Sequence, residues 1–355
     1  MNIIHIISNK AWGGGERYAL DLCTALRSQG NNVAIVCRNK AEVLGPIKDA
    51  GFEPAVMRLG GAFDIFSPIH IARVARRFPG DGPVNIHVHN FKETATAVKV
   101  RQLCHGHRRI NIVCTRHLVK AGKAKQLALY RAIDSLVFVS ERAKSEFIKG
   151  GFDLHDMNID VVHNALPAAP ELPQAQTLHQ PPLILYIGRL SPEKGAHILV
   201  QALGKLTDLE WSARICGQGE GKYVMPMLRL CRTLGIDKRV EWPGHISDVS
   251  EEIAAAQIGV VPTTAPEAFG LSIIEMMRQS LPVVTTDNGA QPEIITHDTD
   301  GLMVAPSDPE ALAEALRRLI TDPQLRHSIG MAGRQRFADN FTYNTFYNKI
   351  TEKYL

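Results

Sequence analysis

The chain has 355 residues, 45% of them hydrophobic and 21% charged, which is enough to bury a sizeable core and to form two domains. It contains no apolar run of the roughly 18 residues that a membrane span requires, and its six cysteines form no C-x-x-C pair, as expected for reduced thiols in a cytosolic protein. Aromatic residues make up only 6% of the chain and no nucleic-acid-binding motif occurs, so nucleic acid is not an expected partner.

The first half of the chain alternates short apolar runs with longer amphipathic segments. This alternation predicts strands and helices in turn, and therefore a parallel sheet covered on both faces. Residues 1–7 have no basic leader and too short an apolar run for a signal peptide, so we interpret them as the first buried strand. The strands expected in this half are residues 3–7, 33–37, 55–59, 84–88, 110–114, 136–139 and 159–162.

A proline-rich stretch of small and polar residues follows, after which the alternation restarts. We place a linker at residues 165–181, between a first domain at 1–164 and a second at 182–340. The strands expected in the second domain are residues 183–187, 211–216, 240–242, 258–261, 283–285 and 302–304, with helix from Asp308 onward. The predicted fold class is α/β, with two doubly wound parallel sheets whose strand ends face a shared ligand-binding crevice.

A glycine cluster follows the first predicted strand. Gly13, Gly14 and Gly15 open a helix, so the backbone N–H groups of this turn could hold a phosphate. Glycine also serves in tight strand-to-helix turns that bind nothing, because it tolerates positive φ. Neither this cluster nor the later glycines at 217, 219 and 221 fit G-x-G-x-x-G, which argues against a dinucleotide dehydrogenase.

Three histidines follow strands of the first half. His87 and His89 alternate along the strand 84–88 and its exit, so their side chains point the same way, and His117 follows the strand 110–114. Each is either a structural hydrogen-bonding residue or a catalytic one. No carboxylate or cysteine cluster accompanies them, so a zinc site is not expected.

Positive charge is concentrated in the first half. Residues 1–165 carry 23 Lys and Arg against 14 Asp and Glu, a net charge of +9, which leaves −5 for residues 166–355. Either a basic amphipathic helix in this half contacts an anionic membrane surface, or its arginines form a solvated face. The residues of that pattern are Arg73, Arg76 and Arg77 with Ile69, Ala72 and Phe78.

Two cations occupy the loop that opens the second half. Arg189 and Lys194 follow the strand 183–187, and Gly188 and Gly195 border them. A guanidinium and an ammonium on one loop match the charge of a diphosphate. The alternative is an exposed basic turn, but the pair beside a strand end favours phosphate binding.

Two carboxylates bracket a further loop and helix start. Glu267 precedes the apolar run that begins the helix, and Glu275 lies about one turn inside it. Gly270 and Ser272 fall where free backbone N–H groups attract anions, so the segment suits a sugar joined to a nucleotide. The Asp298-Thr299-Asp300 triplet resembles a metal-binding carboxylate pair, but it lies in a polar turn away from these loops, and we expect no metal there.

These segments together resemble the retaining glycosyltransferases of family four, which have the GT-B architecture. The motifs are Gly-Gly-x-Glu after the first strand, His-x-His at a later strand end, Gly-Arg-Leu-x-x-Glu-Lys-Gly at the start of the second half, and Glu-x7-Glu with Phe-Gly-Leu-Ser inside it. The resemblance covers nearly the whole chain, in order. It implies transfer of a sugar from a nucleotide sugar with retention of anomeric configuration, without metal or a cofactor.

The resemblance also implies roles for individual residues. Arg189 and Lys194 would bind the donor diphosphate and stabilise the departing phosphate, Glu267 would contact the transferred sugar, and His89 would lie near the reacting centre. The remaining donor-binding residues would be Glu275 at the ribose, the N–H groups of Phe269, Gly270, Leu271 and Ser272, and the glycines Gly14, Gly15, Gly188 and Gly217. Acceptor contacts would come from His87, His117 and Lys120, and from the segments 91–96 and 117–123 and the residues after Gly60.

The aromatic C-terminal segment 341–355 would, by the same resemblance, pack back on the first domain; ordinary packing at the end of the second domain is the alternative. A UDP-sugar donor is favoured and a GDP-sugar remains open. The positive first domain points to an anionic or lipid-linked glycan acceptor, and so to envelope polysaccharide or lipopolysaccharide synthesis in the cytoplasm, with or without peripheral contact to the inner face of the membrane. A non-hydrolysing sugar-nucleotide epimerase and a non-catalytic partner subunit of the same fold are the alternative functions.

Overall fold

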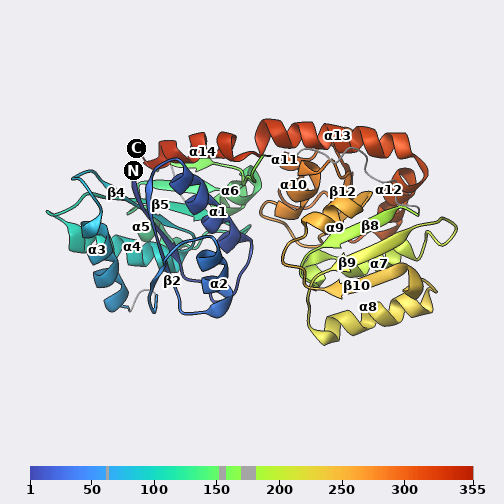
Figure 1. Cartoon of the computed structure of the whole chain (residues 1–355), viewed down its shortest axis with the longest axis horizontal. Helices are drawn as coiled ribbons and strands as arrows, with labels where there is room; N and C mark the ends of the chain where they lie inside the picture. The colour runs from blue at the N-terminus through green and yellow to red at the C-terminus, as the bar shows by residue number, and fades with distance from the viewer. Residues whose placement is uncertain (61–63, 152–156, 169–180, 355) are drawn as a thin grey trace. The chain divides into compact units, whose positions relative to one another are not determined.

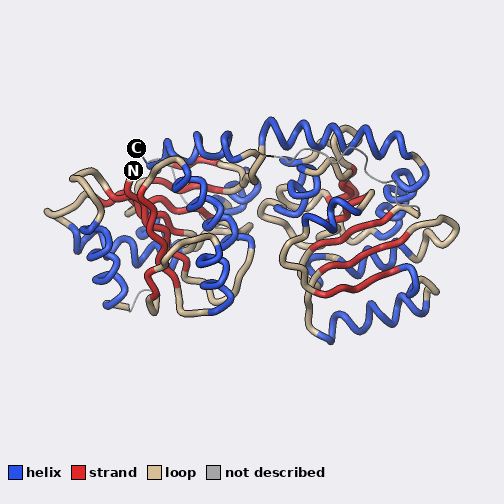
Figure 2. The backbone as a smooth tube through the Cα atoms, viewed as in Figure 1, coloured by secondary structure: helices blue, strands red, loops and turns tan. Residues whose placement is uncertain are grey.

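The computed structural model describes residues 1–60, 64–151, 157–168 and 181–354. The chain forms two compact units: unit 1 comprises Met1–Asn164 together with Tyr343–Leu355, and unit 2 comprises Ala165–Thr342. Each unit is a sheet flanked by helices (Figures 1 and 2). Most of the linker predicted at residues 165–181 lies outside the described residues.

Unit 1 is built on a seven-stranded sheet of order β3-β2-β1-β4-β5-β6-β7, and the strand pairs are parallel. Its strands are β1 (Asn2–Ile7), β2 (Asn32–Cys37), β3 (Ala55–Val56), β4 (Val84–Val88), β5 (Ile110–Arg116), β6 (Ser135–Phe138) and β7 (Ile159–Val161). The larger connecting helices are α1 (Gly14–Ser28), α2 (Ala41–Asp49), α3 (Phe66–Arg77), α4 (Phe91–Cys104) and α6 (Glu141–Ile148). The strand order reverses between β1 and β4, the place where doubly wound sheets bind ligands.

The C-terminal segment of the chain belongs to unit 1. In α14 (Tyr343–Thr351), the ring of Phe346 lies edge-on to Tyr18 of α1, with 5.5 Å between ring centroids. The following turn, η4 (Glu352–Tyr354), buries Tyr354 to 2% exposure. These aromatic side chains anchor the segment in unit 1 through apolar burial.

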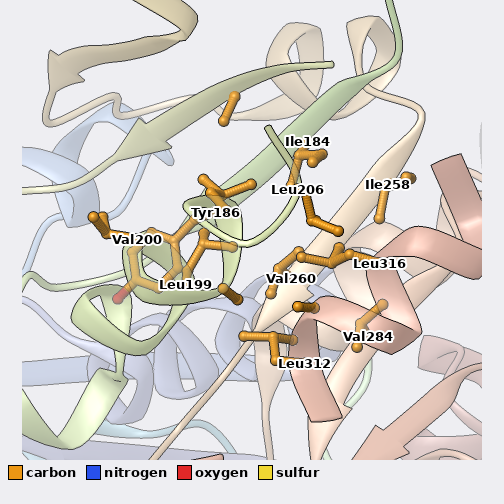
Figure 3. Close-up of a cluster of buried hydrophobic side chains, with 14 of the residues drawn as sticks. Ile184, Tyr186, Leu199, Val200, Leu206, Ile258, Val260, Val284, Leu312 and Leu316 are labelled. Atoms are coloured by element: carbon orange, nitrogen blue, oxygen red, sulfur yellow. The ribbon is translucent and has the colours of Figure 1, made fainter. Parts of the chain in front are cut away.

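Unit 2 contains a six-stranded parallel sheet of order β10-β9-β8-β11-β12-β13. Its strands are β8 (Leu183–Ile187), β9 (Ser212–Cys216), β10 (Val240–Gly244), β11 (Ile258–Val261), β12 (Val283–Thr286) and β13 (Leu302–Val304). Its larger helices are α7 (Ala196–Leu203), α8 (Gly221–Thr233), α9 (Ser250–Ala255), α10 (Leu271–Arg278), α12 (Pro309–Thr321) and α13 (Pro323–Asn340). The core packs β8, β11 and β12 against α7 and α12, as seen for Ile184, Val260, Val284, Leu199 and Leu316 in Figure 3.

One predicted strand is much shorter than expected. The run 55–59 forms a strand only at Ala55–Val56, and Leu59 has a φ of 48°, outside the extended region. Side chains replace the missing strand neighbours here, because Leu59 N–H donates to Ser67 Oγ at 3.1 Å and the Leu59 carbonyl accepts from Arg38. In contrast, β5 continues two residues beyond the expected end, to Arg116.

Candidate functional site

The carboxyl ends of β1, β4 and β5 carry the predicted site residues of unit 1. The helix α1 begins at Gly14, directly after the loop that leaves β1. A Cβ atom at Gly15 would lie 3.6 Å from the His117 ring, so the glycine turn and His117 are neighbours. The structure thus brings the predicted residues Gly14, Gly15, His89 and His117 to one edge of the sheet.

Three histidine rings stack at this edge. The ring centroids of His5 and His87 are 4.8 Å apart, as are those of His87 and His89. His89 also lies 3.2 Å from His117 through their ring nitrogens Nδ1 and Nε2. Sequence reasoning missed His5, which pairs directly with His87 across β1 and β4. The period-2 pattern of β1 does not reveal this partner, because the pairing register comes from a strand about 80 residues away.

His87 is a structural member of this stack. It is fully buried, with Nδ1 2.6 Å from Tyr354 Oη and Nε2 2.7 Å from Thr115 Oγ1. Both ring nitrogens are therefore engaged inside unit 1, and the predicted contact of His87 with an acceptor is corrected to a supporting role behind His89. The link to Tyr354 ties the C-terminal turn to the histidines.

Burial keeps the histidines of this cluster uncharged. It lowers the pKa of His5 to about 3 and that of His117 to about 4, the latter with a smaller contribution from the neighbouring Arg116 cation. It also lowers the pKa of His87 and His89 well below the usual range, with repulsion from neighbouring histidines adding to the effect. Near neutral pH each ring therefore offers one hydrogen-bond donor and one acceptor rather than a positive charge.

Glu93 ties two strand ends together. Its carboxylate, only 2% exposed, accepts hydrogen bonds from Ser8 N–H at 2.7 Å and from His89 N–H at 2.6 Å. Burial raises the pKa of Glu93 to about 7. The residue was not predicted, although Asn90, which caps α4 through Lys92 and Glu93 N–H groups, marks the start of that helix. Glu93 positions the backbone of His89 beside the end of β1.

A pocket of about 550 Å³ opens beside this edge. The predicted residues His89, His117 and Lys120 contribute to its wall, together with the loop after β1. Part of the predicted acceptor region, residues 61–63 after Gly60, lies outside the described residues. The pocket has the size of a small-molecule site.

In unit 2 the predicted diphosphate loop borders a second pocket, of about 780 Å³. The exposed Arg189 lies in its wall beside Gln218 and Glu220. Gly188 and Gly217 lie where the ends of two paired strands approach closely, because a Cβ at Gly217 would fall 1.9 Å from the Gly188 carbonyl oxygen. Two strand-end loops thus meet closely at this pocket.

Lys194 and Glu267 form an ion pair, with Nζ 2.5 Å from Oε2 and side chains 38% and 22% exposed. The two residues are 73 positions apart and come from the loops after β8 and β11. Backbone hydrogen bonds hold the second loop, because Glu267 N–H donates to Asn288 at 3.2 Å and Ala290 N–H donates to the Glu267 carbonyl at 3.0 Å. The residues predicted for phosphate and for sugar are therefore neighbours.

The Phe-Gly-Leu-Ser segment forms the start of α10. Gly270 is its N-cap with a φ of 123°, and Leu271 and Ser272 begin the helix half-buried. Phe269 is 2% exposed and packs edge-on to Phe341 with 5.8 Å between ring centroids, so only its backbone could face a ligand. Glu275 lies in the first helical turns and is also half-buried.

The Asp298-Thr299-Asp300 turn makes contacts within unit 2. Asp298 pairs with Arg318 at 2.8 Å, and Asp300 accepts from Thr296 N–H at 2.7 Å. Among the described residues there is no group of three or more His, Cys, Asp or Glu side chains that could hold a metal ion.

None of the helices in the described ranges is long and apolar enough to cross a membrane.

Comparisons with known proteins identify both halves of the chain. Residues 12–169 match the family described as Glycosyltransferase Family 4, and residues 169–336 match Glycosyl transferases group 1. The chain is 33% identical to an exopolysaccharide phosphotransferase of Streptomyces coelicolor over 62% of this chain and 24% of that protein. It is 27% identical to a glycogen synthase of Mycobacterium tuberculosis over 77% of this chain and 69% of that one. The match to a GDP-mannose-dependent mannosyltransferase of Corynebacterium glutamicum is 27% identical and covers 62% and 61%.

Solved glycosyltransferases share the fold of the whole chain. The crystal structure of Anabaena HepE in complex with UDP and glucose has a TM-score of 0.83 at 20% identity, covering 100% of this chain and 99% of that one. A glycosyltransferase from Rickettsia africae has a TM-score of 0.87 at 20% identity, covering 99% and 97%. These matches confirm the predicted GT-B fold. The chain spans about a quarter of the exopolysaccharide phosphotransferase, the first of these relatives.

Proposed function

We propose that this chain, whose two halves are glycosyltransferase family domains, is a retaining glycosyltransferase. It moves a sugar from a nucleoside-diphosphate sugar to a hydroxyl of a glycan or lipid-linked acceptor, without metal, in envelope polysaccharide or lipopolysaccharide synthesis. The observation that carries this proposal is the ion pair between Lys194 and Glu267. It brings the residue predicted to bind the phosphate and the residue predicted to bind the sugar together at one point of unit 2.

The predicted site residues of unit 2 bind different parts of the donor. The cations Arg189 and Lys194 offset the charge that builds on the departing diphosphate, and the N–H groups at the start of α10 bind the same anion. Glu267 orients Lys194 and accepts hydrogen bonds from the hydroxyls of the transferred sugar. Glu275, about one turn further along α10, binds the ribose hydroxyls.

In unit 1, we infer that His89 lies near the reacting region of the transferred sugar. Its ring is uncharged because burial lowers its pKa, so it brings no positive charge to that region. His5 and His117 hold its two ring nitrogens at 3.4 and 3.2 Å, and Glu93 holds its backbone. These contacts fix the orientation of the ring without an added charge.

A UDP-sugar is the favoured donor. A similar fold binds UDP and UDP-glucose in Anabaena HepE, whereas relatives from Corynebacterium glutamicum and Mycobacterium tuberculosis are named as GDP-mannose-dependent. The preference for uridine therefore rests on the similarity of the fold to HepE. GDP-sugars are included in the donor panel that tests it.

We expect purified protein to release nucleoside diphosphate from one member of a panel of UDP- and GDP-sugars when an acceptor glycan extract is present. Mass spectrometry of the product should show one added sugar, nuclear magnetic resonance should show a retained anomeric configuration, and excess chelator should leave the rate unchanged. An epimerised nucleotide sugar formed without acceptor would instead indicate the epimerase. Failure to bind any nucleotide sugar in calorimetry would favour the non-catalytic subunit.

The membrane contact rests on a separate patch of unit 1, the α3 patch, which combines exposed apolar and basic side chains. Ile65 and Phe66 are 62% and 70% exposed at the start of α3, and the exposed arginines lie further along the helix. Ala72 is buried at 3% and faces the core, whereas Ile69 is 38% exposed, so only part of the predicted apolar stripe faces outward. The α3 patch consists of Val56, Ile65, Phe66 and Ile69 with Arg58, Arg73 and Arg77.

We expect the protein to sediment with phosphatidylglycerol-containing vesicles and not with phosphatidylcholine vesicles, with less bound at high salt. Changing both Ile65 and Phe66 to serine should lower the bound fraction several-fold, because serine has no apolar side chain to insert into the membrane interface. The matched control is Met331→Ser, which removes an exposed apolar side chain (42%) from unit 2. Equal sedimentation of the double variant and the parent protein would show that the α3 patch is only a solvated surface.

A further inference from the structure

The charged side chains that line the pocket of unit 1 are all positive. Its wall carries six Lys and Arg side chains and no Asp or Glu, and none of the six forms an ion pair with a described carboxylate. A concave site of one sign concentrates the field of its charges and attracts counter-ions. The six cations are Lys10, Arg38, Lys92, Arg116, Lys120 and Lys123.

Arg116 is the most deeply placed of these cations. It ends β5 with only 9% exposure, its Nη1 donates to Tyr130 Oη at 2.6 Å, and its guanidinium carbon lies 4.5 Å from the centroid of the Phe147 ring. Its Nε–H is buried without a hydrogen-bond partner among the described residues. A buried donor of this kind loses its hydration without compensation unless a ligand supplies an acceptor.

Arg38 repeats this arrangement on the opposite side of the glycine turn, at the end of β2. One of its Nη groups donates to the Leu59 carbonyl, and its buried Nε–H has no partner among the described residues. The two guanidinium groups are thus held by neighbouring main-chain and hydroxyl oxygens while each keeps one donor unused. Guanidinium groups bind phosphate and carboxylate oxygens through such fixed, planar sets of donors.

We propose that this pocket binds a phosphate group carried by the acceptor, with Arg116 as its anchor and Lys120 and Lys123 at its rim. The inference rests on the proposed function, in which unit 2 holds the nucleotide sugar and the pocket of unit 1 receives the acceptor. His89 and His117 line the same pocket, so a phosphate held by Arg116 places a hydroxyl of the acceptor within reach of the histidines. A phosphate monoester carries a charge of about −1.5 to −2 near pH 7. It therefore matches a pocket with six cations better than a carboxylate ligand, which carries a single negative charge.

The phosphate could belong to the glycan or to a lipid carrier, and paired probes separate these sources. Glucose 6-phosphate with glucose represents a sugar phosphate, and farnesyl diphosphate with farnesol represents a lipid phosphate. Calorimetry should show binding of the phosphorylated member of at least one pair and at least tenfold weaker binding of its neutral partner. Glucuronic acid tests a carboxylate in place of phosphate and should bind at least tenfold more weakly than the phosphorylated probe.

Variants then locate the bound phosphate. The Lys120→Ala, Lys123→Ala double variant changes exposed side chains, and Arg116→Gln changes the anchor; each should raise the dissociation constant of the phosphorylated probe about tenfold or more. Binding of UDP and GDP should be unchanged in both. The matched control, Lys48→Ala, removes an exposed lysine of α2 outside the pocket and should change neither. If Arg116→Gln does not fold, the double lysine variant decides alone.

The outcomes separate this inference from the proposed function. If UDP or GDP binds but no phosphorylated probe does, or if the neutral probes or glucuronic acid bind equally well, the pocket is not a phosphate site and the proposed function is untouched. If the pocket variants weaken nucleotide binding instead, the pocket belongs to the donor and the inference is overturned. If the parent protein binds no nucleotide at all, the proposed function fails first.

Discussion

Replacing Lys194 by alanine is expected to lower kcat by about 10²- to 10³-fold, the loss seen when one charge-stabilising group is removed from a transition state. The Lys194 ammonium is held 2.5 Å from Glu267 and therefore occupies one position rather than many. Its attraction to the diphosphate grows as the bond to the sugar breaks, so the change should affect kcat more than the KM for the nucleotide sugar. Initial rates over a range of donor concentrations measure both constants.

Two further variants separate charge from structure. Arg189→Ala removes the second cation from the loop and should cause a loss of similar size, whereas Lys194→Arg keeps the charge and should recover part of the rate. Lys238→Ala removes an exposed lysine of the turn Asp237–Arg239 and should leave the rate unchanged. A Lys194→Ala protein with a normal circular dichroism spectrum and near-normal kcat would show that this cation does not act on the leaving group.

The periodicity of apolar residues was sufficient to predict the sheets. Runs such as residues 183–187 and 258–261 became β8 and β11 with the expected ends, because strands buried on both faces are continuously apolar. The run 55–59 failed because its end is set by tertiary contacts: Arg38 and Ser67 bind the backbone of Leu59 in place of a neighbouring strand. No local pattern in residues 55–59 encodes those two partners.

The site could be predicted only where one loop carries its own signal. Arg189, Lys194 and Glu267 stand beside glycines and prolines that mark loops, so their sequence positions already indicated strand-end sites. His5 and Glu93 could not be found in this way, since their significance depends on β1 lying between β2 and β4. Arg116 is similar, because its burial against Tyr130 and Phe147 follows from packing and not from the residues next to it.

The loop that carries Arg189 and Lys194 depends on a glycine at its end. Gly195 has a φ of 73°, and a Cβ atom there would lie 1.8 Å from the Pro262 carbonyl oxygen, at the end of β11. This contact between the loops after β8 and β11 also brings Lys194 close to Glu267. An alanine would require the two backbone segments to separate, so the contact is part of the site's geometry and not only of its stability.

We therefore expect Gly195→Ala to lower the free energy of unfolding by more than about 4 kcal/mol, at the upper end for single substitutions. Urea unfolding is followed by tryptophan fluorescence in a Trp12→Phe background, so that the signal comes from Trp211 and Trp242 of unit 2. Gly235→Ala has a similar φ of 68° but nothing within 4 Å of its Cβ, so it should lose only about 1–2 kcal/mol from backbone strain. Gly221→Ala has open space at a helix start and no positive φ, and should lose nothing. Equal losses for Gly195→Ala and Gly235→Ala would mean that backbone strain, and not the approach of Pro262, requires glycine at position 195.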